Sequence, residues 1–356
     1  MTILLCGGGT LGPVTPLLTV VRSMKKMRND VSFVWAGTPD GPEAALVLRE
    51  EIRFVSIPVA KLSRYPSLHW LTWPRDYVRA RRAARQILDE VRPTLVVGAG
   101  GFTQVPLMQE ADRRKLPCVI HQLDAAPTLS NRVIARRCRS VTTSFEYSSP
   151  PFGRNVQTMR VSTPCRYAGV AIPDKEAGAS YFFLDPARPI VFVFGGGTGA
   201  LLLNQAMDIV RERLPNVQFI FATGEGRGAR LAADRRTVVK KFLDERDMLF
   251  AYAASDVIVC RAGMGTLSEL AVLSRSAIVV PIPNSHQEEN AEALKEGIVV
   301  VEQRDGFEEH LKRILTSDPR LLTLEARQSL GKTLNRLLPT SDGMELAERW
   351  LHLINM

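Results

Sequence analysis

The chain has 356 residues, of which 45% are hydrophobic and 23% charged, with no biased tract. This composition is typical of a globular protein with two domains of ordinary size and excludes a fibrous or disordered chain. No apolar run approaches the roughly 18 residues of a transmembrane helix, and the first apolar run leads straight into glycines, so we expect no signal peptide. The five cysteines are scattered without CxxC pairs, which indicates reduced thiols in a cytosolic protein rather than disulfides or a zinc site.

The net charge of +9 is unevenly distributed. The residues up to Cys165 carry 23 Lys and Arg against 12 Asp and Glu, whereas the remainder carries 23 against 25. A basic first half beside a near-neutral second half indicates that only the first half faces an extended anionic partner. Nucleic acid and anionic lipid both fit this pattern.

In chain order, the apolar run at residues 2–6 ends in a glycine turn at 7–12 and precedes a helical pattern, for which Thr15 is the expected N-cap and Pro16 the first helical residue. The same strand, glycine turn and helix return at 189–210. Further strand candidates are 32–35, 95–97, 118–120, 219–221, 257–259 and 277–280. Continuous apolar runs separated by helices predict parallel sheets covered on both faces, hence an α/β protein with two Rossmann-like domains.

Two breaks in the pattern predict the domain boundaries. One lies at residues 163–166, and it divides a first domain at 1–164 from a second at 165–340. The other, at 338–341, precedes a final helix at 344–353. We expect this last segment, 341–356, to pack back on the first domain.

Three glycine-rich turns, at 7–12, 195–199 and 263–266, are candidates for phosphate binding. Glycine lets the backbone approach a ligand, and the helix behind it offers free N–H groups and a positive dipole. The alternative is tight packing of strand on helix, but three such turns favour phosphate. The first turn also fits GxGxxG, yet residues 34–37 lack the acid that a nicotinamide cofactor needs.

The segment 260–269 has two interpretations. Thr266 and Glu269 form a capping box, or Glu269 stands at a helix N-terminus where its carboxylate accepts hydrogen bonds from ribose hydroxyls. Gln287 and Asn290 lie three residues apart, so they share one helical face, as two amides that bind sugar hydroxyls would. The alternative for these two is a solvated helix start.

These segments resemble, in order and over nearly the whole chain, the MurG family of N-acetylglucosaminyltransferases. The matching blocks are 8–12 with Pro16, 100–102 with Pro106, 121–131, 195–200 with Asn204, and 261–269 with 286–287 and 290–291. The resemblance implies a GT-B fold, with a cleft between two Rossmann-like domains. It also implies inverting transfer of GlcNAc from UDP-GlcNAc to lipid I, undecaprenyl-pyrophosphoryl-MurNAc-pentapeptide, which gives lipid II in peptidoglycan synthesis.

The resemblance also implies roles for single residues. In the second domain Glu269 would hold the ribose, Gln287 and Asn290 the GlcNAc, and Arg166 a donor phosphate. The turn residues Gly197, Thr198, Gly199, Gly263, Met264, Gly265 and Thr266 would cradle the pyrophosphate. The acceptor side would be lined by Thr10, Asp124 and Asn131 with Gly9, Gly12 and Phe102. No DxD ends an apolar strand, so we expect no cofactor and no obligatory metal, with helix dipoles and Arg166 stabilising the departing UDP.

The departures from the family pattern concern the general base. Pro13 replaces the histidine proposed as base, residues 121–124 read His-Gln-Leu-Asp instead of His-Glu-Gln-Asn, and Gly197 replaces a serine. The transfer needs a proton acceptor, and we assign this role to Asp124. The alternative is a structural aspartate. Three other functions stay open: transfer to another lipid or sugar acceptor, non-catalytic binding of a sugar nucleotide, and epimerisation of a UDP-sugar.

A basic, aromatic stretch at residues 61–92 includes Trp70, Leu71 and Trp73. Trp and Tyr among Lys and Arg are typical of a membrane interface, whereas no RNA-binding motif accompanies them, so we expect no nucleic-acid partner. The alternative is a loop whose tryptophans pack inward. We therefore expect a peripheral protein on the anionic inner face of the plasma membrane. The arginines 132, 136, 137 and 139 either extend that face or bind the acceptor pyrophosphate.

Overall fold

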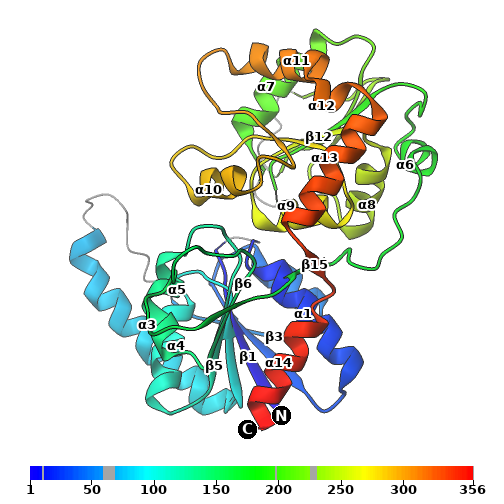
Figure 1. Cartoon of the computed structure of the whole chain (residues 1–356). Helices are drawn as coiled ribbons and strands as arrows, with labels where there is room; N and C mark the ends of the chain where they lie inside the picture. Colours follow the sequence, from blue (N-terminus) through cyan, green and yellow to red (C-terminus); the bar gives the residue numbers. More distant parts are fainter. Residues whose placement is uncertain (10–11, 59–68, 197–198, 225–230, 356) are drawn as a thin grey trace. The chain divides into compact units, whose positions relative to one another are not determined.

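The structure is a computed structural model that describes residues 1–9, 12–58, 69–196, 199–224 and 231–355. The chain forms two compact units, one of Met1–Arg166 with Ser341–Met356 and one of Tyr167–Thr340 (Figure 1). The division thus falls two residues after the predicted boundary. The last helix, α14 (Met344–Asn355), packs against α1 (Val14–Met27) in the first unit.

The first unit contains a sheet of seven parallel strands in the order β3-β2-β1-β4-β5-β6-β7. The strands are β1 (Thr2–Cys6), β2 (Ser32–Gly37), β3 (Arg53–Ser56), β4 (Leu95–Gly98), β5 (Cys118–Gln122), β6 (Ser140–Thr143) and β7 (Thr158–Arg160). The other helices are α2 (Glu43–Arg49), α3 (His69–Val91), α4 (Gln104–Arg113), α5 (Leu129–Ile134) and the short 3₁₀ helix η1 (Ala135–Arg137). In Figure 1, α3, α4 and α5 cover one face of this sheet, and α1 and α14 the other. Because both faces are covered, the central strands are continuous apolar runs.

The second unit repeats this plan with six parallel strands in the order β11-β10-β9-β12-β13-β14. The strands are β9 (Ile190–Phe194), β10 (Gln218–Ala222), β11 (Thr237–Lys240), β12 (Val257–Cys260), β13 (Ala277–Val279) and β14 (Val299–Val300). The helices are α6 (Lys175–Tyr181), α7 (Leu201–Glu212), α8 (Glu245–Ala254), α9 (Met264–Val272), α10 (His286–Ala293), α11 (Phe307–Ser317), α12 (Pro319–Leu322) and α13 (Leu324–Leu337). Two further short strands, β8 (Thr163–Pro164) and β15 (Thr340–Ser341), pair where the chain passes between the units. The predicted α/β class with two Rossmann-like domains is confirmed.

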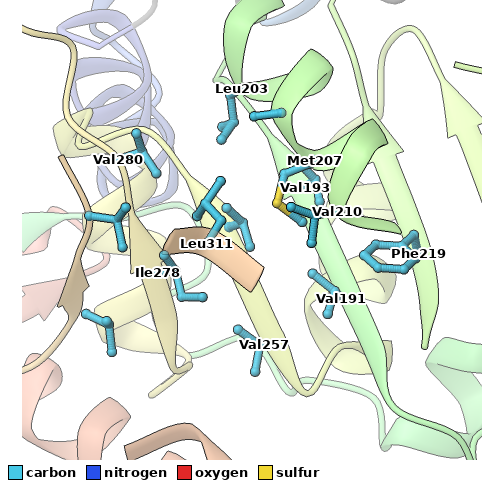
Figure 2. Packing of buried hydrophobic residues seen from close by; sticks show 14 of the residues in the cluster. Val191, Val193, Leu203, Met207, Val210, Phe219, Val257, Ile278, Val280 and Leu311 are labelled. Atoms are coloured by element: carbon cyan, nitrogen blue, oxygen red, sulfur yellow. The ribbon is translucent and has the colours of Figure 1, made fainter. Parts of the chain in front are cut away.

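The core of the second unit lies between its sheet and one helix layer (Figure 2). Val191 and Val193 of β9 pack there with residues of β12, β13, α7 and α11. Phe192 and Phe194 alternate with these valines and contact the ring of Tyr252 of α8. Both faces of β9 therefore pack against apolar side chains. This packing fixes the register of the strand, and with it the residue at which the glycine turn after Phe194 begins.

The helix after the first glycine turn begins earlier than predicted. Pro13 already has helical backbone angles, φ −77° and ψ −14°, and α1 starts at Val14. Thr15 is therefore not the N-cap, and its carbonyl accepts a hydrogen bond from the Thr19 hydroxyl at 3.0 Å. The prediction took Pro16 as the first helical residue. It was wrong because Pro13, which also lacks an N–H group that needs a partner, suits the residue before the helix equally well.

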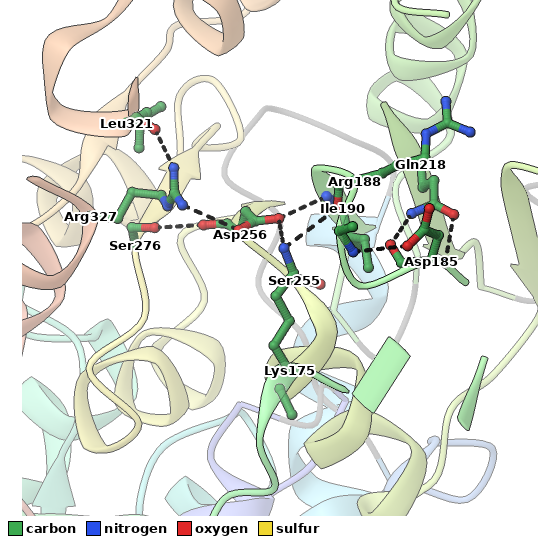
Figure 3. Close-up of polar contacts among 12 residues, drawn as sticks. Lys175, Asp185, Arg188, Ile190, Gln218, Ser255, Asp256, Ser276, Leu321 and Arg327 are labelled. Atoms are coloured by element: carbon green, nitrogen blue, oxygen red, sulfur yellow. Dashed lines mark hydrogen bonds and ion pairs between the residues drawn. The ribbon is translucent and has the colours of Figure 1, made fainter. Parts of the chain in front are cut away.

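At the amino end of the second sheet, Asp256 connects two helices to a strand (Figure 3). One carboxylate oxygen accepts from Lys175 Nζ of α6 at 2.8 Å and from the N–H of Ile190 at 2.9 Å. The other accepts from Arg327 Nη2 of α13 at 3.2 Å. The Asp256 side chain is only 14% exposed, so this cluster holds α6 and α13 at the edge of the sheet opposite the glycine turns.

We expect Asp256→Ala to lower the free energy of unfolding of the second unit by about 3 kcal/mol, because two half-buried cations and an N–H group lose their partner. Far-UV circular dichroism during urea unfolding measures this change. Tryptophan fluorescence follows the first unit alone, since all four tryptophans belong to it.

The matched control is Glu309→Ala, which removes the exposed ion pairs with Arg213 and Lys312 in the same unit. It should cost less than about 1 kcal/mol. Equal losses in the two variants would contradict the role given to Asp256.

Candidate functional site

In the second unit, three loops meet at the carboxyl edge of the sheet. Cys260 of β12 pairs with Phe194 of β9 on one side and with Val279 of β13 on the other. The described residues that follow these strands, 195–196 with 199–200, 261–263 and 280–285, therefore lie next to one another. Strand order reverses between β9 and β12, and such switch points are where open α/β sheets bind ligands.

Two helices begin at this edge with uncapped N-termini. α7 follows Ala200 and α9 follows Gly263, and neither has a capping side chain or an acidic residue in its first turn. Their first N–H groups and positive dipole ends suit an anion such as a diphosphate. A Cβ at Gly195 would lie 2.4 Å from the backbone nitrogen of Ala200, so only glycine allows the turn to close this tightly.

The predicted phosphate-binding residues fall on these two turns. Gly199 has a φ of +70° and donates its N–H to the carbonyl of Gly196 at 2.9 Å. Gly197 and Thr198 lie outside the described residues. In the other turn, Gly263 is the N-cap of α9, and Met264, Gly265 and Thr266 form its first turn.

Glu269 lies in the second turn of α9. The capping-box interpretation is wrong, because the extended backbone of Gly263 starts the helix before Thr266. The Glu269 side chain is buried, with the residue 7% exposed, and its Oε2 accepts a hydrogen bond from the Tyr252 hydroxyl at 2.7 Å. The carboxylate is thus held at a fixed position behind the switch point.

Tyr252 was not predicted as a functional residue. It is fully buried, and its ring makes edge-on contacts with Phe192, Phe194 and Tyr167. Its hydroxyl is the donor to Glu269. The sequence evidence for Tyr252 was indirect. A tyrosine at a core position of a helix needs a hydrogen-bond partner for its hydroxyl, and that partner is usually a polar group at a fixed position.

The amide side chains of α10 connect the loops. The Gln287 Oε1 accepts from the N–H of Ile282 at 3.2 Å, and Gln287 stays half-buried. Asn290 is fully buried and donates from Nδ2 to the carbonyl of Ala262 at 3.2 Å. The structure therefore gives Asn290 a contact that orients the turn before α9, which the sequence did not predict.

Arg261 places a buried positive charge beside these loops. Its guanidinium donates to the carbonyls of Val280 and Pro281 and to Gln303 Oε1. It forms no ion pair with any residue that the structure describes, and burial lowers the pKa of the guanidinium from its usual value. An arginine with only neutral partners leaves its positive potential for a ligand at this edge.

In the first unit, the loops after β1 and β4 approach each other closely. A Cβ at Gly101, whose φ is +93°, would lie 3.1 Å from the carbonyl of Gly8. The N–H of Gly9 donates to Oε2 of the fully buried Glu43 at 3.2 Å, so this carboxylate holds the first glycine turn. Thr10 lies outside the described residues, and Gly12 is half-buried in the turn before Pro13.

A chain of buried amides joins the loops after β4 and β5. The N–H of Gly100 donates to Gln104 Oε1 at 3.0 Å, Gln104 Nε2 to Asn131 Oδ1 at 2.5 Å, and Asn131 Nδ2 to Gln122 Oε1 at 2.7 Å. Gln122 Nε2 then donates to the carbonyl of Asp124 at 2.9 Å. The three amide side chains are fully buried. Asn131 therefore positions the Asp124 loop, and neither Gln104 nor Gln122 was predicted to matter.

The acceptor-side candidates Asp124 and Phe102 remain accessible to solvent. Asp124 is half-buried, and its carbonyl also accepts from the Tyr147 hydroxyl at 3.2 Å. Burial, and then the nearby Asp124 charge, raise the pKa of Tyr147 to about 12. Phe102 is exposed. Asp124 is thus a carboxylate on a fixed loop at the carboxyl edge of the first sheet.

His121, the fourth residue of β5, is a supporting residue. Both ring nitrogens lie within hydrogen-bond distance of hydroxyls, Nδ1 3.0 Å from Thr142 and Nε2 3.3 Å from Ser144. Burial lowers the pKa of His121 to about 4, so the ring is neutral at pH 7. It ties β5 to β6 beneath the Asp124 loop.

The start of α3 carries an exposed face that combines apolar and basic residues. Leu71 is 81% exposed, and Val78, Arg75, Arg79 and Arg82 are exposed at helical spacing from it. On the other face Trp73 stacks on Tyr77, with ring centroids 5.0 Å apart, while Arg81 and Arg85 pair with the buried Glu110. Residues 59–68 and the side chain of Trp70 lie outside the described part.

No described helix combines the length and apolar character of a membrane span.

Arg166, the predicted phosphate ligand, is half-buried and is the last residue of the first unit before Tyr167. It follows the short strand β8, whose neighbour Cys165 donates its N–H to the carbonyl of Ser341 at 2.8 Å. The residue before Arg166 is thereby fixed to the segment that follows Thr340. Its role toward a phosphate stays a prediction.

Comparison with known proteins links these two units to one family. The model of the glycosyltransferase family 28 N-terminal domain matches residues 3–143, and that of the C-terminal domain matches residues 190–329. A curated UDP-N-acetylglucosamine--N-acetylmuramyl-(pentapeptide) pyrophosphoryl-undecaprenol N-acetylglucosamine transferase of a Nocardioides species is 33% identical, over 99% of this chain and 98% of its own. An enzyme of the same name from Paenarthrobacter aurescens is 33% identical, over 90% and 89%. The crystal structure of Acinetobacter baumannii MurG has the same fold, with a TM-score of 0.72 at 19% identity and 99% coverage of both chains.

Proposed function

The chain belongs to glycosyltransferase family 28, and on this premise we propose that it transfers N-acetylglucosamine from UDP-N-acetylglucosamine to undecaprenyl-pyrophosphoryl-MurNAc-pentapeptide, which makes lipid II for peptidoglycan synthesis. The observation that carries the proposal is the carboxyl edge of the second sheet. Within one unit it brings together two uncapped helix N-termini, the buried Arg261 and the buried Glu269. This combination suits a nucleoside diphosphate, whose phosphates match the helix N-termini and whose ribose hydroxyls match a carboxylate.

In the donor site, the N–H groups at the starts of α7 and α9 would bind the diphosphate, and Arg166 would pair with one phosphate. Glu269 would accept hydrogen bonds from the ribose hydroxyls, and Gln287 and Asn290 would orient the sugar. Fixed N–H groups and dipoles stabilise the charge that develops on the departing UDP without reorganisation. We therefore propose a site that works without a cofactor or a resident metal.

On the acceptor side, Asp124 would act as general base. The acceptor hydroxyl oxygen attacks the anomeric carbon while the bond from that carbon to the UDP oxygen breaks, and the proton passes to the Asp124 carboxylate. A single displacement inverts the anomeric carbon. The buried amide chain from Gln104 to Gln122 would keep the base in position, since its last hydrogen bond ends on the carbonyl of Asp124.

The acceptor lipid implies a membrane partner. We propose that the exposed face of α3 rests on the anionic inner surface of the plasma membrane, with Leu71 and Val78 at the interface and Arg75, Arg79 and Arg82 toward the headgroups. Each arginine near such a surface contributes about 1 kcal/mol of attraction. The chain would then be a peripheral protein of the cytoplasmic side.

Product analysis tests this function. Purified protein is incubated with labelled UDP-N-acetylglucosamine and a short-chain lipid I analogue, and we expect a labelled disaccharide lipid whose new linkage, read by NMR, is inverted relative to the donor. UDP-N-acetylgalactosamine serves as the matched control donor and should give little product.

One observation favours a second candidate function. Residue 13 is a proline, and the family resemblance places the proposed base at this position, so a non-catalytic sugar-nucleotide-binding protein would allow the replacement. In that case the product assay yields nothing, although calorimetry detects binding of UDP-N-acetylglucosamine. Product from a different lipid or sugar acceptor alone would replace the acceptor in the proposal while keeping the donor.

A further inference from the structure

The carboxylate of Glu43 lies behind the first glycine turn, and the transfer reaction proposed above makes no use of it. Glu43 is the first residue of α2, and its side chain is fully buried. Among the residues that the structure describes, its partners are the hydrogen-bond donors Gly9 and Thr38, and neither is a cation. A buried carboxylate is tolerated in such surroundings only where hydrogen bonds replace its lost hydration.

Three hydrogen bonds tie the loops after β1 and β2 to this carboxylate. Oε2 accepts from the N–H of Gly9 at 3.2 Å. Oε1 accepts from the N–H of Thr38 at 2.7 Å and from its hydroxyl at 2.6 Å. Each carboxyl oxygen therefore serves a different loop. Because β1 and β2 are neighbouring parallel strands, both loops leave the same edge of the sheet, and Glu43 links them there.

Glycines leave the space that the carboxylate occupies. A Cβ at Gly8 or at Gly41 would overlap a carboxyl oxygen of Glu43, so the turn closes over Glu43 only without side chains at these positions. A second contact from β2 holds the start of the turn, since Trp35 Nε1 donates to the carbonyl of Gly7 at 2.9 Å. The rear of the turn is thus fixed by side chains at two points.

The outer side of the turn is open. Gly9 is exposed, its φ is +82°, and a Cβ there would meet no atom of the described residues within 4 Å. Its N–H donates inward to Glu43, so the carboxylate sets the backbone from behind while the outer side stays accessible to a ligand. The next residue along the chain is Thr10, which the family resemblance places on the acceptor side.

We propose that Glu43 is a positioning residue for the acceptor. By holding the N–H of Gly9, its carboxylate keeps the first glycine turn in the conformation that binds the lipid-linked acceptor. The inference rests on the proposed function, and it adds to that function a residue that acts through Gly9 and not on the acceptor itself.

Glutamine cannot replace this carboxylate, although it has the same size. It has a single acceptor oxygen, and when this oxygen serves Thr38, its NH₂ group faces the N–H of Gly9, so that two donors meet. Loss of the hydrogen bond to Gly9 should release the turn. Acceptor binding then weakens equally in the ground state and the transition state, which raises KM and leaves kcat unchanged.

Steady-state transfer to a short-chain lipid I analogue tests this role in Glu43→Gln. We expect the KM for the acceptor to rise about tenfold, the effect of losing a hydrogen bond to a charged group. The KM for the donor and kcat should stay at the wild-type values. A wild-type KM for the acceptor in this variant would overturn the positioning role.

The matched control is Glu110→Gln, the same substitution at a buried carboxylate of the same unit, which pairs with Arg81 and Arg85. It should lower the stability of the unit and keep the wild-type KM for the acceptor. If both variants raise this KM equally, the effect comes from general destabilisation, and the positioning role is overturned.

A second variant carries the test if Glu43→Gln does not fold. Thr38→Val removes the hydroxyl bond to Oε1 but keeps the buried carboxylate, and it should raise the KM for the acceptor about threefold. An unchanged KM in Thr38→Val would then overturn the proposal. Absence of product from the wild-type chain would contradict the transfer itself and the positioning role with it. Product from the wild type with an unaffected Glu43→Gln would overturn the positioning role alone.

Discussion

Replacing Asp124 by asparagine should lower kcat at least about 100-fold and leave the affinity for UDP-N-acetylglucosamine unchanged, because removal of a general base costs about 10² to 10⁴ in rate. Asparagine keeps the size of the side chain and cannot take up the proton. The hydrogen bonds that hold residue 124 come from Gln122 and Tyr147 to its backbone carbonyl, and both remain possible in the variant. Steady-state rates and calorimetric titration with the donor measure the two quantities.

One comparison sharpens this result. Tyr147→Phe removes one hydrogen bond to the carbonyl of Asp124 while keeping the carboxylate, so it should lower kcat only a few-fold. If Asp124→Asn keeps most of its turnover, the base is another residue.

Glu269→Ala should weaken UDP binding about 100-fold, since two charge-assisted hydrogen bonds to the ribose, each worth about 1.5 kcal/mol or more, are lost. Calorimetry with UDP measures the affinity. The decisive comparison uses 2′,3′-dideoxy-UDP, which lacks both hydroxyls. Wild type and variant should bind this analogue with similar affinity. If the variant instead loses the same affinity for UDP and for the analogue, Glu269 acts on the fold rather than on the ribose.

Tyr252→Phe is the matched variant for this prediction. It keeps the carboxylate of Glu269 and the aromatic packing but removes the hydroxyl that donates at 2.7 Å. We expect UDP binding to weaken about fivefold, the effect of losing one hydrogen bond, with the loss again confined to the ligand that carries ribose hydroxyls.

The sequence predicted the parts of the fold that local patterns determine. The predicted apolar runs are the central strands of two parallel sheets, and the described residues of the three glycine turns lie at carboxyl edges. The outer strands β3, β6, β7, β11 and β14 were not predicted. The helix starts predicted near Thr15 and Thr266 were wrong. Pro13 and Gly263 set the starts of α1 and α9 through backbone angles, and no apolar or capping pattern records these angles.

The residues that the sequence did not predict act through partners far along the chain. Glu43 holds Gly9 across 34 residues, Gln104 reaches Asn131 across 27, and Tyr252 reaches Glu269 from the preceding helix. Such contacts exist only once the sheet has brought the loops together.

The basic stretch also has partners that the sequence did not predict. Arg81 and Arg85 are paired with Glu110 of the next helix, α4, and are not free for a membrane.

The most direct test of the proposed transfer is UDP release from UDP-N-acetylglucosamine by the purified wild-type chain, with and without a short-chain lipid I analogue. We expect rapid release that depends on the acceptor and matches the disaccharide product mole for mole. Release that depends on the acceptor would also mean that Pro13 is compatible with catalysis, because another residue takes the proton. Release at the same rate without acceptor, or no release while the donor binds, would contradict the account.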